Sequence, residues 1–355
     1  MRSFYDSIFF NVPHLRFPEF EKEWEETELQ DIVPNICSGK DKISNSGEIV
    51  LYGSTGVIGR TDFASYKENI VLVARVGANA GQMQIGNAPC GVTDNTLVID
   101  AKEWNNYIYY FLQRYNLNRL VFGSGQPLIT GGMLKKIKVR YGNKVERNKI
   151  TRLLCLLDER IATQNKIIDK LQSLIKGIRV CCMQRVYGNN VHLSEIAQIY
   201  QPQTISSTEL TEDGFLVYGA NGIIGKYKDY NHETEQICIT CRGNTCGMVN
   251  YTKPMSWITG NAMVINTDKY QDKVCKRYLY HYLSGYNFNS IISGSGQPQI
   301  VRTPLEKLKI TLPTISEQKQ KAMILDKIQD KIDISHKILN LYIRQKQHLL
   351  RQMFI

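Results

Sequence analysis

The sequence predicts an α+β protein in which two copies of a mixed α/β unit alternate with two long helices. Three observations lead to this prediction: an internal repeat, predicted strands and a helix at matching places in both copies, and a heptad pattern after each copy. The 355 residues suffice for two or three domains. Hydrophobic residues make up 43% and charged residues 22% of the chain, as in globular rather than disordered or fibrous proteins.

The repeat appears when the sequence is compared with itself. The segment from Leu51 to Arg60 returns 166 residues later as Val217 to Lys226, with glycines at the same three places. A Gly-Ser-Gly-Gln-Pro sequence occupies 123–127 and again 294–298. These motifs recur in the same order, so we expect the two copies to share one fold.

Each copy is predicted to contain short strands and one helix. In the first copy the strands are expected at 49–52, 70–76, 96–99 and 137–139, and the helix at 102–115. The second copy has strands at 237–240 and 262–265 and a helix at 273–283 in matching places. The glycines that follow the strand at 49–52, and their counterparts in the second copy, are predicted to supply positive φ angles in tight turns.

A long helix with a coiled-coil pattern is predicted after each copy. Steps of four and three residues, with one polar exception, link Ile150, Leu154, Leu157, Ile161, Gln164, Ile168, Leu171, Ile175, Ile178 and Cys182. The same steps, with two polar exceptions, link Leu325, Ile328, Ile332, Ser335, Leu339, Tyr342, Lys346, Leu349 and Met353. Helices of roughly 35 to 40 residues are on the order of 50 to 60 Å long. Pairing as an antiparallel coiled coil is the simplest way to bury both seams; the alternative is that each helix packs on its own globular unit.

These elements divide the chain into a first unit over residues 1–145, a helix over 146–187, a second unit over 188–313 and a second helix over 314–355. The net charge of +11 suggests a polyanionic partner. Most of the excess lies on the helices, because residues 144–187 hold 10 basic and 4 acidic side chains and residues 314–355 hold 8 and 4. The two globular units are nearly neutral, which argues against a protein that coats phosphates with its main body.

The sequence lacks the signatures of the common catalytic and cofactor sites. The glycines at 53, 56 and 59 are spaced Gly-x-x-Gly-x-x-Gly, whereas a dinucleotide loop needs Gly-x-Gly-x-x-Gly. Tyr227 stands where a phosphate loop would need Ser or Thr. The Pro89-Cys90 pair has no cofactor loop beside it, and neither a nuclease carboxylate cluster nor a hydrolase serine elbow is found. We expect a non-catalytic chain with no cofactor of its own.

Metal, disulfide and membrane features are also weak. Cys238, Cys241 and Cys246 lack the second pair that a zinc site would need, and no histidine has another three or four residues away. Nine cysteines at irregular spacing favour reduced thiols. No apolar run approaches the roughly 18 residues of a membrane helix, and the N-terminus does not read as a secretory signal. We therefore expect a cytoplasmic protein with no metal and no membrane contact.

Two related units at a fixed separation suit a target with two half-sites, for which duplex DNA is the obvious example. The copies differ at predicted turns, where Arg75 corresponds to Cys241 and Val76 to Arg242, so we expect an asymmetric two-part site. Arg and Lys suit guanine edges, and Asn and Gln suit adenine edges. The candidates for DNA contact are Lys40, Arg60, Arg75, Asn79 and Gln126 in the first copy and Lys226, Arg242, Asn244 and Gln297 in the second. For each, the alternative is a solvated surface charge or an amide that forms a turn.

The whole chain resembles the DNA-specificity subunit of a type I restriction-modification system. The resemblance rests on the entry from Pro13 to Phe20 with Trp24, on the duplicated Tyr-Gly-x-x-Gly-x-x-Gly and Gly-Ser-Gly-Gln-Pro motifs, and on Glu317-Gln318 at the start of the last helix. Where the first helix starts, Glu146-Arg147 replaces the Glu-Gln that the family favours.

The resemblance implies two target-recognition domains that read an asymmetric two-part site on double-stranded DNA. It further implies two adenine methyltransferase subunits that use S-adenosylmethionine, and restriction and translocase subunits that use ATP and Mg²⁺. On this interpretation the cofactors belong to the partners, and the basic helices offer surfaces for partner subunits and phosphates. Two alternatives remain: a stand-alone tandem nucleic-acid-binding protein, which would bind its site without another subunit, and a structural scaffold, which would not need Arg60 or Lys226.

Overall fold

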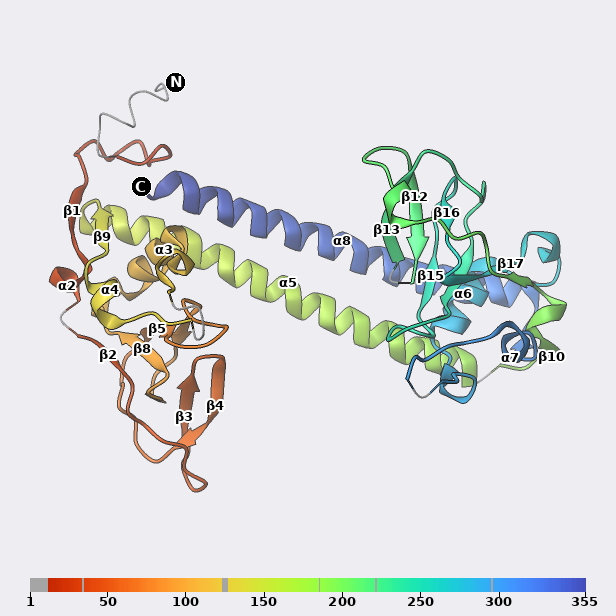
Figure 1. Cartoon of the computed structure of the whole chain (residues 1–355), viewed down its shortest axis with the longest axis horizontal. Coiled ribbons are helices and arrows are strands. Elements are labelled where there is room, and N and C mark those ends of the chain that lie inside the picture. Colours follow the sequence, from red (N-terminus) through yellow and green to blue (C-terminus); the bar gives the residue numbers. More distant parts are fainter. Residues whose placement is uncertain (1–11, 34, 123–126, 185, 221, 295) are drawn as a thin grey trace. The chain divides into compact units, whose positions relative to one another are not determined.

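A computed structural model describes residues 12–33, 35–122, 127–184, 186–220, 222–294 and 296–355. The chain forms two compact units. Unit 1 comprises residues 1–165 and 338–355, and unit 2 comprises residues 166–337. Each unit holds one repeat together with part of each long helix, as the colours along the chain show in Figure 1.

Unit 1 contains two small sheets and a separate strand pair. The first sheet has the antiparallel order β2 (Ile36–Ser38), β8 (Thr96–Ile99), β5 (Ile70–Ala74), β6 (Met83–Gly86). The second has the order β4 (Gly56–Thr61), β3 (Ile49–Gly53), β7 (Cys90–Val92), with β3 and β7 parallel. The separate pair is β1 (Glu25–Glu28) with β9 (Lys138–Tyr141). The helical elements are α2 (Leu29–Ile32), η1 (Lys102–Trp104), α3 (Asn105–Tyr115), η2 (Leu117–Leu120) and α4 (Gly131–Lys135).

Unit 2 repeats this arrangement strand for strand. Its first sheet has the order β11 (Gln198–Tyr200), β17 (Ala262–Asn266), β14 (Ile237–Thr240), β15 (Val249–Tyr251), and its second β13 (Gly222–Tyr227), β12 (Phe215–Gly219), β16 (Trp257–Ile258). The separate pair is β10 (Asn189–His192) with β18 (Lys309–Leu312). The helical elements are η3 (Leu193–Glu195), η4 (Ser207–Glu209), η5 (Asp268–Tyr270), α6 (Lys276–Ser284), η6 (Phe288–Ser290) and α7 (Arg302–Glu306). The predicted duplication of one mixed α/β fold is therefore confirmed.

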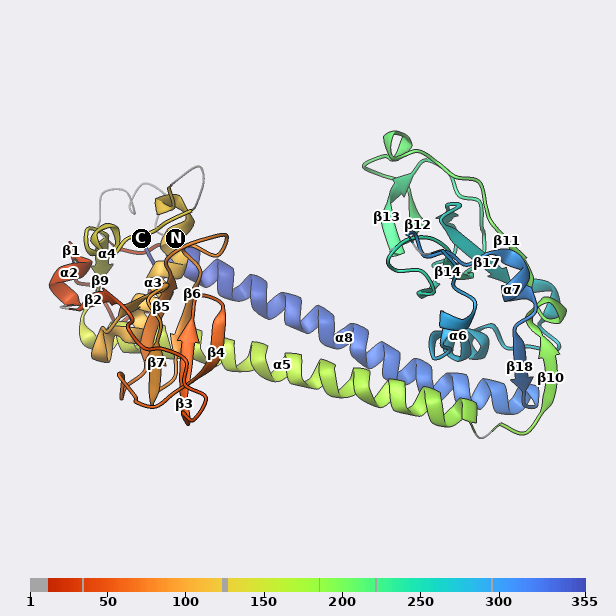
Figure 2. The same ribbon diagram turned by 60° about the horizontal axis from the view of Figure 1, so that its bottom comes forward.

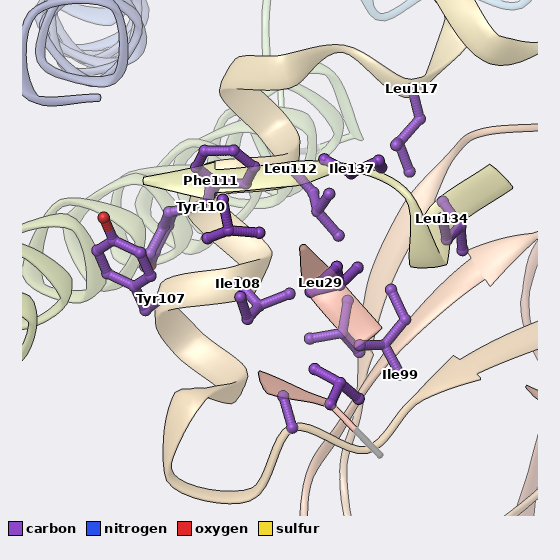
Figure 3. Packing of buried hydrophobic residues seen from close by; sticks show 14 of the residues in the cluster. Leu29, Ile99, Tyr107, Ile108, Tyr110, Phe111, Leu112, Leu117, Leu134 and Ile137 are labelled. Carbon is purple, nitrogen blue, oxygen red and sulfur yellow. The ribbon is translucent and has the colours of Figure 1, made fainter. Parts of the chain in front are cut away.

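The central strand of each repeat is buried on both faces, which explains its uninterrupted apolar sequence. Val71 and Val73 of β5 face the α3 side of the sheet, in one core cluster with Ile108. Ile70 and Leu72 face the other way, in a cluster with side chains of β3 and β7. Figure 3 shows side chains of α3 directed toward Ile99 and the other residues of this core. The repeat thus has three layers, with a helix on one face of the sheet and the second sheet on the other.

The two long helices are α5 (Lys144–Gln184) and α8 (Ile315–Met353), and their heptad residues are buried or half-buried. In unit 2, Ile175 near the end of α5 packs with Leu325 near the start of α8. In unit 1, Ile150 near the start of α5 lies in one cluster with Leu350 and Met353 at the end of α8. Early residues of one helix pair with late residues of the other, so the predicted antiparallel coiled coil is confirmed.

Some predicted boundaries are wrong for physical reasons. The strand predicted at 70–76 ends at Ala74, because residues 77–81 turn the chain back toward β6. The glycines predicted in tight turns lie largely in strands: Gly53 ends β3, and β4 contains Gly56 and Gly59. Gly56, with φ of +118°, and its counterpart Gly222, with φ of +85°, have the positive φ that the turn prediction required, and Gly56 follows a turn at residues 54–55. Glycine disfavours strand formation, so the sequence gives no sign of a strand here. The segment forms β4 because it pairs with β3.

Charged side chains tie the helix of each repeat to the long helices. In unit 2 the carboxylate of Asp326 on α8 accepts from His281 Nε2 at 2.7 Å and from Arg277 Nε at 2.8 Å, both on α6. Arg179 of α5 donates to the other ring nitrogen of His281 at 3.2 Å. In unit 1 the corresponding tie runs from Tyr110 of α3 to Asp158 of α5 at 2.8 Å.

Burial lowers the pKa of His281, an effect that the hydrogen bond to Asp326 opposes and that the charges of Arg179 and Arg277 reinforce. Burial likewise lowers the pKa of His232. The unfolded chain therefore binds protons more readily than the folded chain once the pH falls below about 6.5.

Lowering the pH from 7.5 to 5.5 should therefore weaken unit 2. The stability that depends on neutral His281 and His232 is fully present above the histidine pKa of the unfolded chain. It is lost as the pH falls through that pKa toward the lower pKa of the folded chain. The measurement is hydrogen exchange of peptides from α6, corrected for the intrinsic effect of pH. His281→Gln should flatten the pH dependence, whereas His336→Gln, at an exposed position of α8, should leave it unchanged. An equally steep dependence in the His281 variant would contradict this assignment.

Candidate functional site

The first candidate surface is the end of β5, where the backbone of three segments meets. Arg75 N donates to Asn95 O at 3.0 Å, and Ile129 N donates to Arg75 O at 2.9 Å. Gly77 N donates to Pro127 O at 2.9 Å, and the φ of Gly77 is +80°, a region that favours glycine. The turn after β5 is therefore held against the segment that follows residues 123–126.

The second repeat makes the same backbone contacts at the end of β14. Cys241 N donates to Asn261 O at 3.1 Å, and Ile300 N donates to Cys241 O at 3.0 Å. Gly243 N donates to Pro298 O at 2.9 Å, with a φ of +86° at Gly243. The two sequences thus hold side chains of different chemistry on the same backbone framework.

The hairpin of β3 and β4 adds a polar pocket to this surface. Gln84 of β6 donates from Nε2 to Gly53 O at 2.7 Å, which holds the end of the hairpin against β6, as can be followed in Figure 2. The pocket has a volume of about 340 Å³ and is lined by Ser54, Thr55, Asn79, Gln82, Met83 and Gln84. In the second repeat Asn250 takes the place of Gln84. A Cβ added to Gly56 would lie 3.8 Å from Gln84 Oε1, and a Cβ added to the equivalent Gly222 would lie 3.8 Å from Asn250 Oδ1.

The nine predicted side chains are distributed over several elements. In the first repeat Asn79 lines the polar pocket, while Arg75 is half-buried and donates to Ser38 at 3.2 Å. Lys40 is exposed after β2, and Arg60 is exposed on β4 and donates to the carbonyl of Glu48. Gln126 lies outside the described residues.

In the second repeat Arg242, Asn244 and Gln297 are exposed at the end of β14 and in the segment docked on it. An isolated bridge joins Arg242 to Gln299, which brings the two segments together. Lys226 stands apart on β13, where its ammonium lies 3.4 Å from the carboxylate of Asp213. The structure therefore gathers part of the predicted set at one sheet end and leaves Lys40, Arg60 and Lys226 on other elements.

Sequence reasoning missed Ser54, Thr55, Gln82 and Gln84. Their signal was present, because uncharged amides and hydroxyls cluster within and beside the repeated glycine motif. They were overlooked because the turn at Ser54 and Thr55 lies some 30 residues before Gln82 and Gln84 in sequence, and only the fold brings the two segments together. The hairpin end is thus a part of the candidate surface that only the fold reveals.

Other kinds of site find little support among the described residues. No group of three or more histidine, cysteine, aspartate or glutamate side chains there is arranged to hold a metal ion. None of the described helices combines the length and apolar character needed to cross a membrane.

Comparison with known proteins gives a consistent result for both repeats. The model of the type I restriction modification DNA specificity domain matches the chain twice, at residues 21–173 and 189–341. The EcoprrI type I restriction enzyme specificity subunit of Escherichia coli is 31% identical over 147 residues, which cover 40% of this chain and 36% of that protein. A putative specificity subunit of Haemophilus influenzae is 28% identical over 140 residues. The chain thus aligns with about a third of the length of these two relatives.

Two further proteins align along nearly the whole chain. The MjaVIII specificity subunit of Methanocaldococcus jannaschii is 25% identical over an alignment of 408 positions, which covers 94% of this chain and 92% of that protein. The crystal structure of the type I restriction-modification S subunit from M. genitalium superposes with a TM-score of 0.75 at 18% identity and covers 97% of this chain and 99% of its own. The structural likeness shows that the two chains share a fold.

Proposed function

Since the chain belongs to the family of type I restriction-modification DNA-specificity proteins, we propose that it recognises an asymmetric two-part DNA site, with one repeat reading each half. It acts as a non-catalytic subunit that directs adenine methylation and restriction by its partners.

The observation that carries this proposal is one backbone framework presenting two sets of side chains. Gly77 and Gly243 make equivalent backbone contacts, yet the next exposed positions differ, with Ala78 in the first repeat and Asn244 in the second. A catalytic pair of domains would need the same reacting groups in both copies. Two readers of different sequences need the same framework and different surface residues.

The proposed division of labour follows the four segments. Residues 1–145 and 188–313 are the target-recognition domains, and residues 146–187 and 314–355 are spacers that dock the partner subunits. Large apolar side chains that point into solvent on the long helices support docking there. Leu174, Ile324, Ile334 and Leu341 each remain between 50% and 62% exposed. Exposed apolar surface of this kind marks protein contacts.

The partners we propose are two adenine methyltransferase subunits together with restriction and translocase subunits. S-adenosylmethionine, ATP and Mg²⁺ then bind to those subunits rather than to this chain. The basic residues of the spacers face the partners or the DNA phosphates, which accounts for a charge excess outside the recognition domains.

The division of labour predicts separate effects of Arg60→Ala and Lys226→Ala. Each should relax the base preference in one half of the methylated motif and leave the other half unchanged. A lost base contact costs about 1–3 kcal/mol of discrimination. The measurement is sequencing of methylated adenines in cells that make each variant with its methyltransferase subunit.

Lys102→Ala is the matched control, because this exposed lysine is paired with Asp100 at 2.9 Å in the first repeat and should leave the motif intact. A variant that changed both halves together would contradict the division.

A further inference from the structure

The hairpins β3–β4 and β12–β13 each carry two consecutive large apolar residues that point into solvent. Val57 is 61% and Ile58 41% exposed, and the equivalent Ile223 and Ile224 are 54% and 46% exposed. Neighbouring residues of a regular strand face opposite sides, so one of each pair should be covered. The same departure in both repeats calls for a physical cause.

The cause is a β-bulge at the same place in each hairpin. In the first, Leu51 pairs with Gly59 and Tyr52 with Val57, which leaves Ile58 without a partner on β3. In the second, Val217 pairs with Gly225 and Tyr218 with Ile223, which leaves Ile224 in the same position. A bulge adds a residue and redirects the side chains beside it. Here it turns both apolar side chains outward.

A glycine beneath each bulge fixes the position of the isoleucine. A Cβ added to Gly53 would lie 3.0 Å from the Ile58 side chain, and one added to Gly219 would lie 3.0 Å from the Ile224 side chain. A larger residue at this position would force the isoleucine to shift. The apolar pair is thus held in place before any partner binds, which lowers the entropy cost of binding.

β4 and β13 are edge strands, since the sheet orders are β4-β3-β7 and β13-β12-β16. Another segment bonds to each strand near its far end, where Ser44 N donates to Arg60 O at 2.8 Å and Thr211 N to Lys226 O at 2.9 Å. Apolar side chains on an open edge invite aggregation, and proteins usually protect such edges with charges or prolines. The four residues Val57, Ile58, Ile223 and Ile224, which we call the apolar tips, have no such protection within their own strands until Arg60 and Lys226.

The surroundings of the apolar tips match the chemistry of a DNA groove. The end of the first hairpin borders the pocket lined by Asn79, Gln82 and Gln84, whose amides suit base edges. Arg60 follows Ile58 by two residues and is exposed on the same strand. Lys226 follows Ile224 at the same spacing, is half-buried and lies 3.4 Å from the carboxylate of Asp213. A cation suits a guanine edge, and an apolar group suits the C5-methyl of thymine. A two-stranded ribbon also fits the width of the major groove.

On the basis of the proposed function, we propose that each hairpin enters the major groove and that its apolar tip reads a thymine methyl group in its own half of the site. The repeated Gly-x-x-Gly-x-x-Gly motif then serves to build a narrow ribbon with an apolar end. Specificity at this position comes from apolar contact rather than from hydrogen bonds.

The test uses the full chain together with its methyltransferase subunit in cells, with methylated adenines mapped by sequencing. The double variant Val57→Ala/Ile58→Ala should relax the preference for an A·T pair at one position of the first half and leave the second half unchanged. Ile223→Ala/Ile224→Ala should do the reverse. Each methyl contact with the thymine that a variant loses should lower the preference for the A·T pair about fourfold.

Phe63→Ala is the control, because this side chain is 79% exposed beyond the far end of β4 and should leave both halves unchanged. Motifs identical to that of the unmodified chain would overturn the proposal. So would relaxation only at G·C pairs, loss of co-purification with the methyltransferase subunit, or a concentration-dependent dimer that the variants abolish. If the unmodified chain directs no two-part motif at all, the proposed function itself fails, so the two failures are distinguishable.

Discussion

Replacing Glu146 by alanine should destabilise unit 1 by about 3–5 kcal/mol, because it leaves a buried arginine without its counter-ion. The Glu146 side chain is fully buried and accepts from Arg16 Nε at 2.7 Å and Nη2 at 2.9 Å. Arg16 is itself only 9% exposed. The pair joins the N-terminal segment to the start of α5, and a Cβ on Gly142 would collide with the carboxylate.

The measurement is urea unfolding followed by fluorescence in a Trp257→Phe background, where the remaining Trp24 and Trp104 both report on unit 1. Glu103→Ala is the control, since Glu103 pairs with Lys144 in solvent and its loss should barely move the midpoint. Replacing both members of the buried pair, as Arg16→Met/Glu146→Leu, should recover most of the stability. Equal midpoints for the Glu146 and Glu103 variants would show that the buried pair does not support the fold.

Replacing Phe354 by alanine should cost unit 1 about 3–5 kcal/mol by opening a cavity in its core. Phe354 is 2% exposed, and its ring centroid lies 5.3 Å from that of Tyr107 and 6.4 Å from that of Phe111. The residue that follows α8 therefore completes the core around α3, although some 240 residues separate the two in sequence. Aromatic contacts of this kind add to the apolar area that Phe354 buries.

The same unfolding assay tests this expectation. Leu341→Ala, also on α8 but 62% exposed, should change the stability of unit 1 by no more than about 0.5 kcal/mol. Phe354→Leu should lose less than Phe354→Ala, because it refills most of the cavity. If the alanine variant unfolded at the same urea concentration as the unmodified chain, Phe354 would not belong to the core of unit 1.

Strong periodic signals made the architecture predictable. The heptad residues of α5 and α8 are buried or half-buried, and a long seam of this kind is most simply buried by another helix. The buried strands β8 and β14 occupy the predicted residues, because short apolar runs bounded by turn residues have few alternatives. The duplication was visible because its motifs kept their order.

Features that depend on distant partners were not predictable. The glycine motif does not itself predict a strand, because pairing with β3 decides its structure.

The change from Gln to Arg at the start of the first long helix could also be explained only from the fold. Arg147 lies over the Trp104 ring, 3.4 Å from its centroid, whereas Gln318 in α8 accepts from Cys275 N at 2.8 Å and donates to Pro313 O at 2.9 Å. Arg147 and Gln318 contact different neighbours, so arginine in place of glutamine at position 147 fits its own surroundings.

The candidate site was predicted only in part for the same reason. Residue type identified Asn79 and Arg242 at exposed turns, but it could not reveal that Arg75 turns back toward Ser38. Side-chain direction depends on backbone geometry that propensities do not specify. The residues of the hairpin ends, on which base reading should depend most, emerge only once the bulge and the sheet edge are known.

The central claim, that each repeat reads one half of a two-part DNA site, is tested most directly by mapping methyladenine. Genomic DNA would be sequenced from cells that make the methyltransferase subunit with and without this chain. We expect methyladenine at a gapped two-part motif only when the chain is present, and exchange of residues 30–143 for those of a relative should alter one half alone. Identical methylation without the chain, or no motif although both proteins are made and co-purify, would contradict the claim.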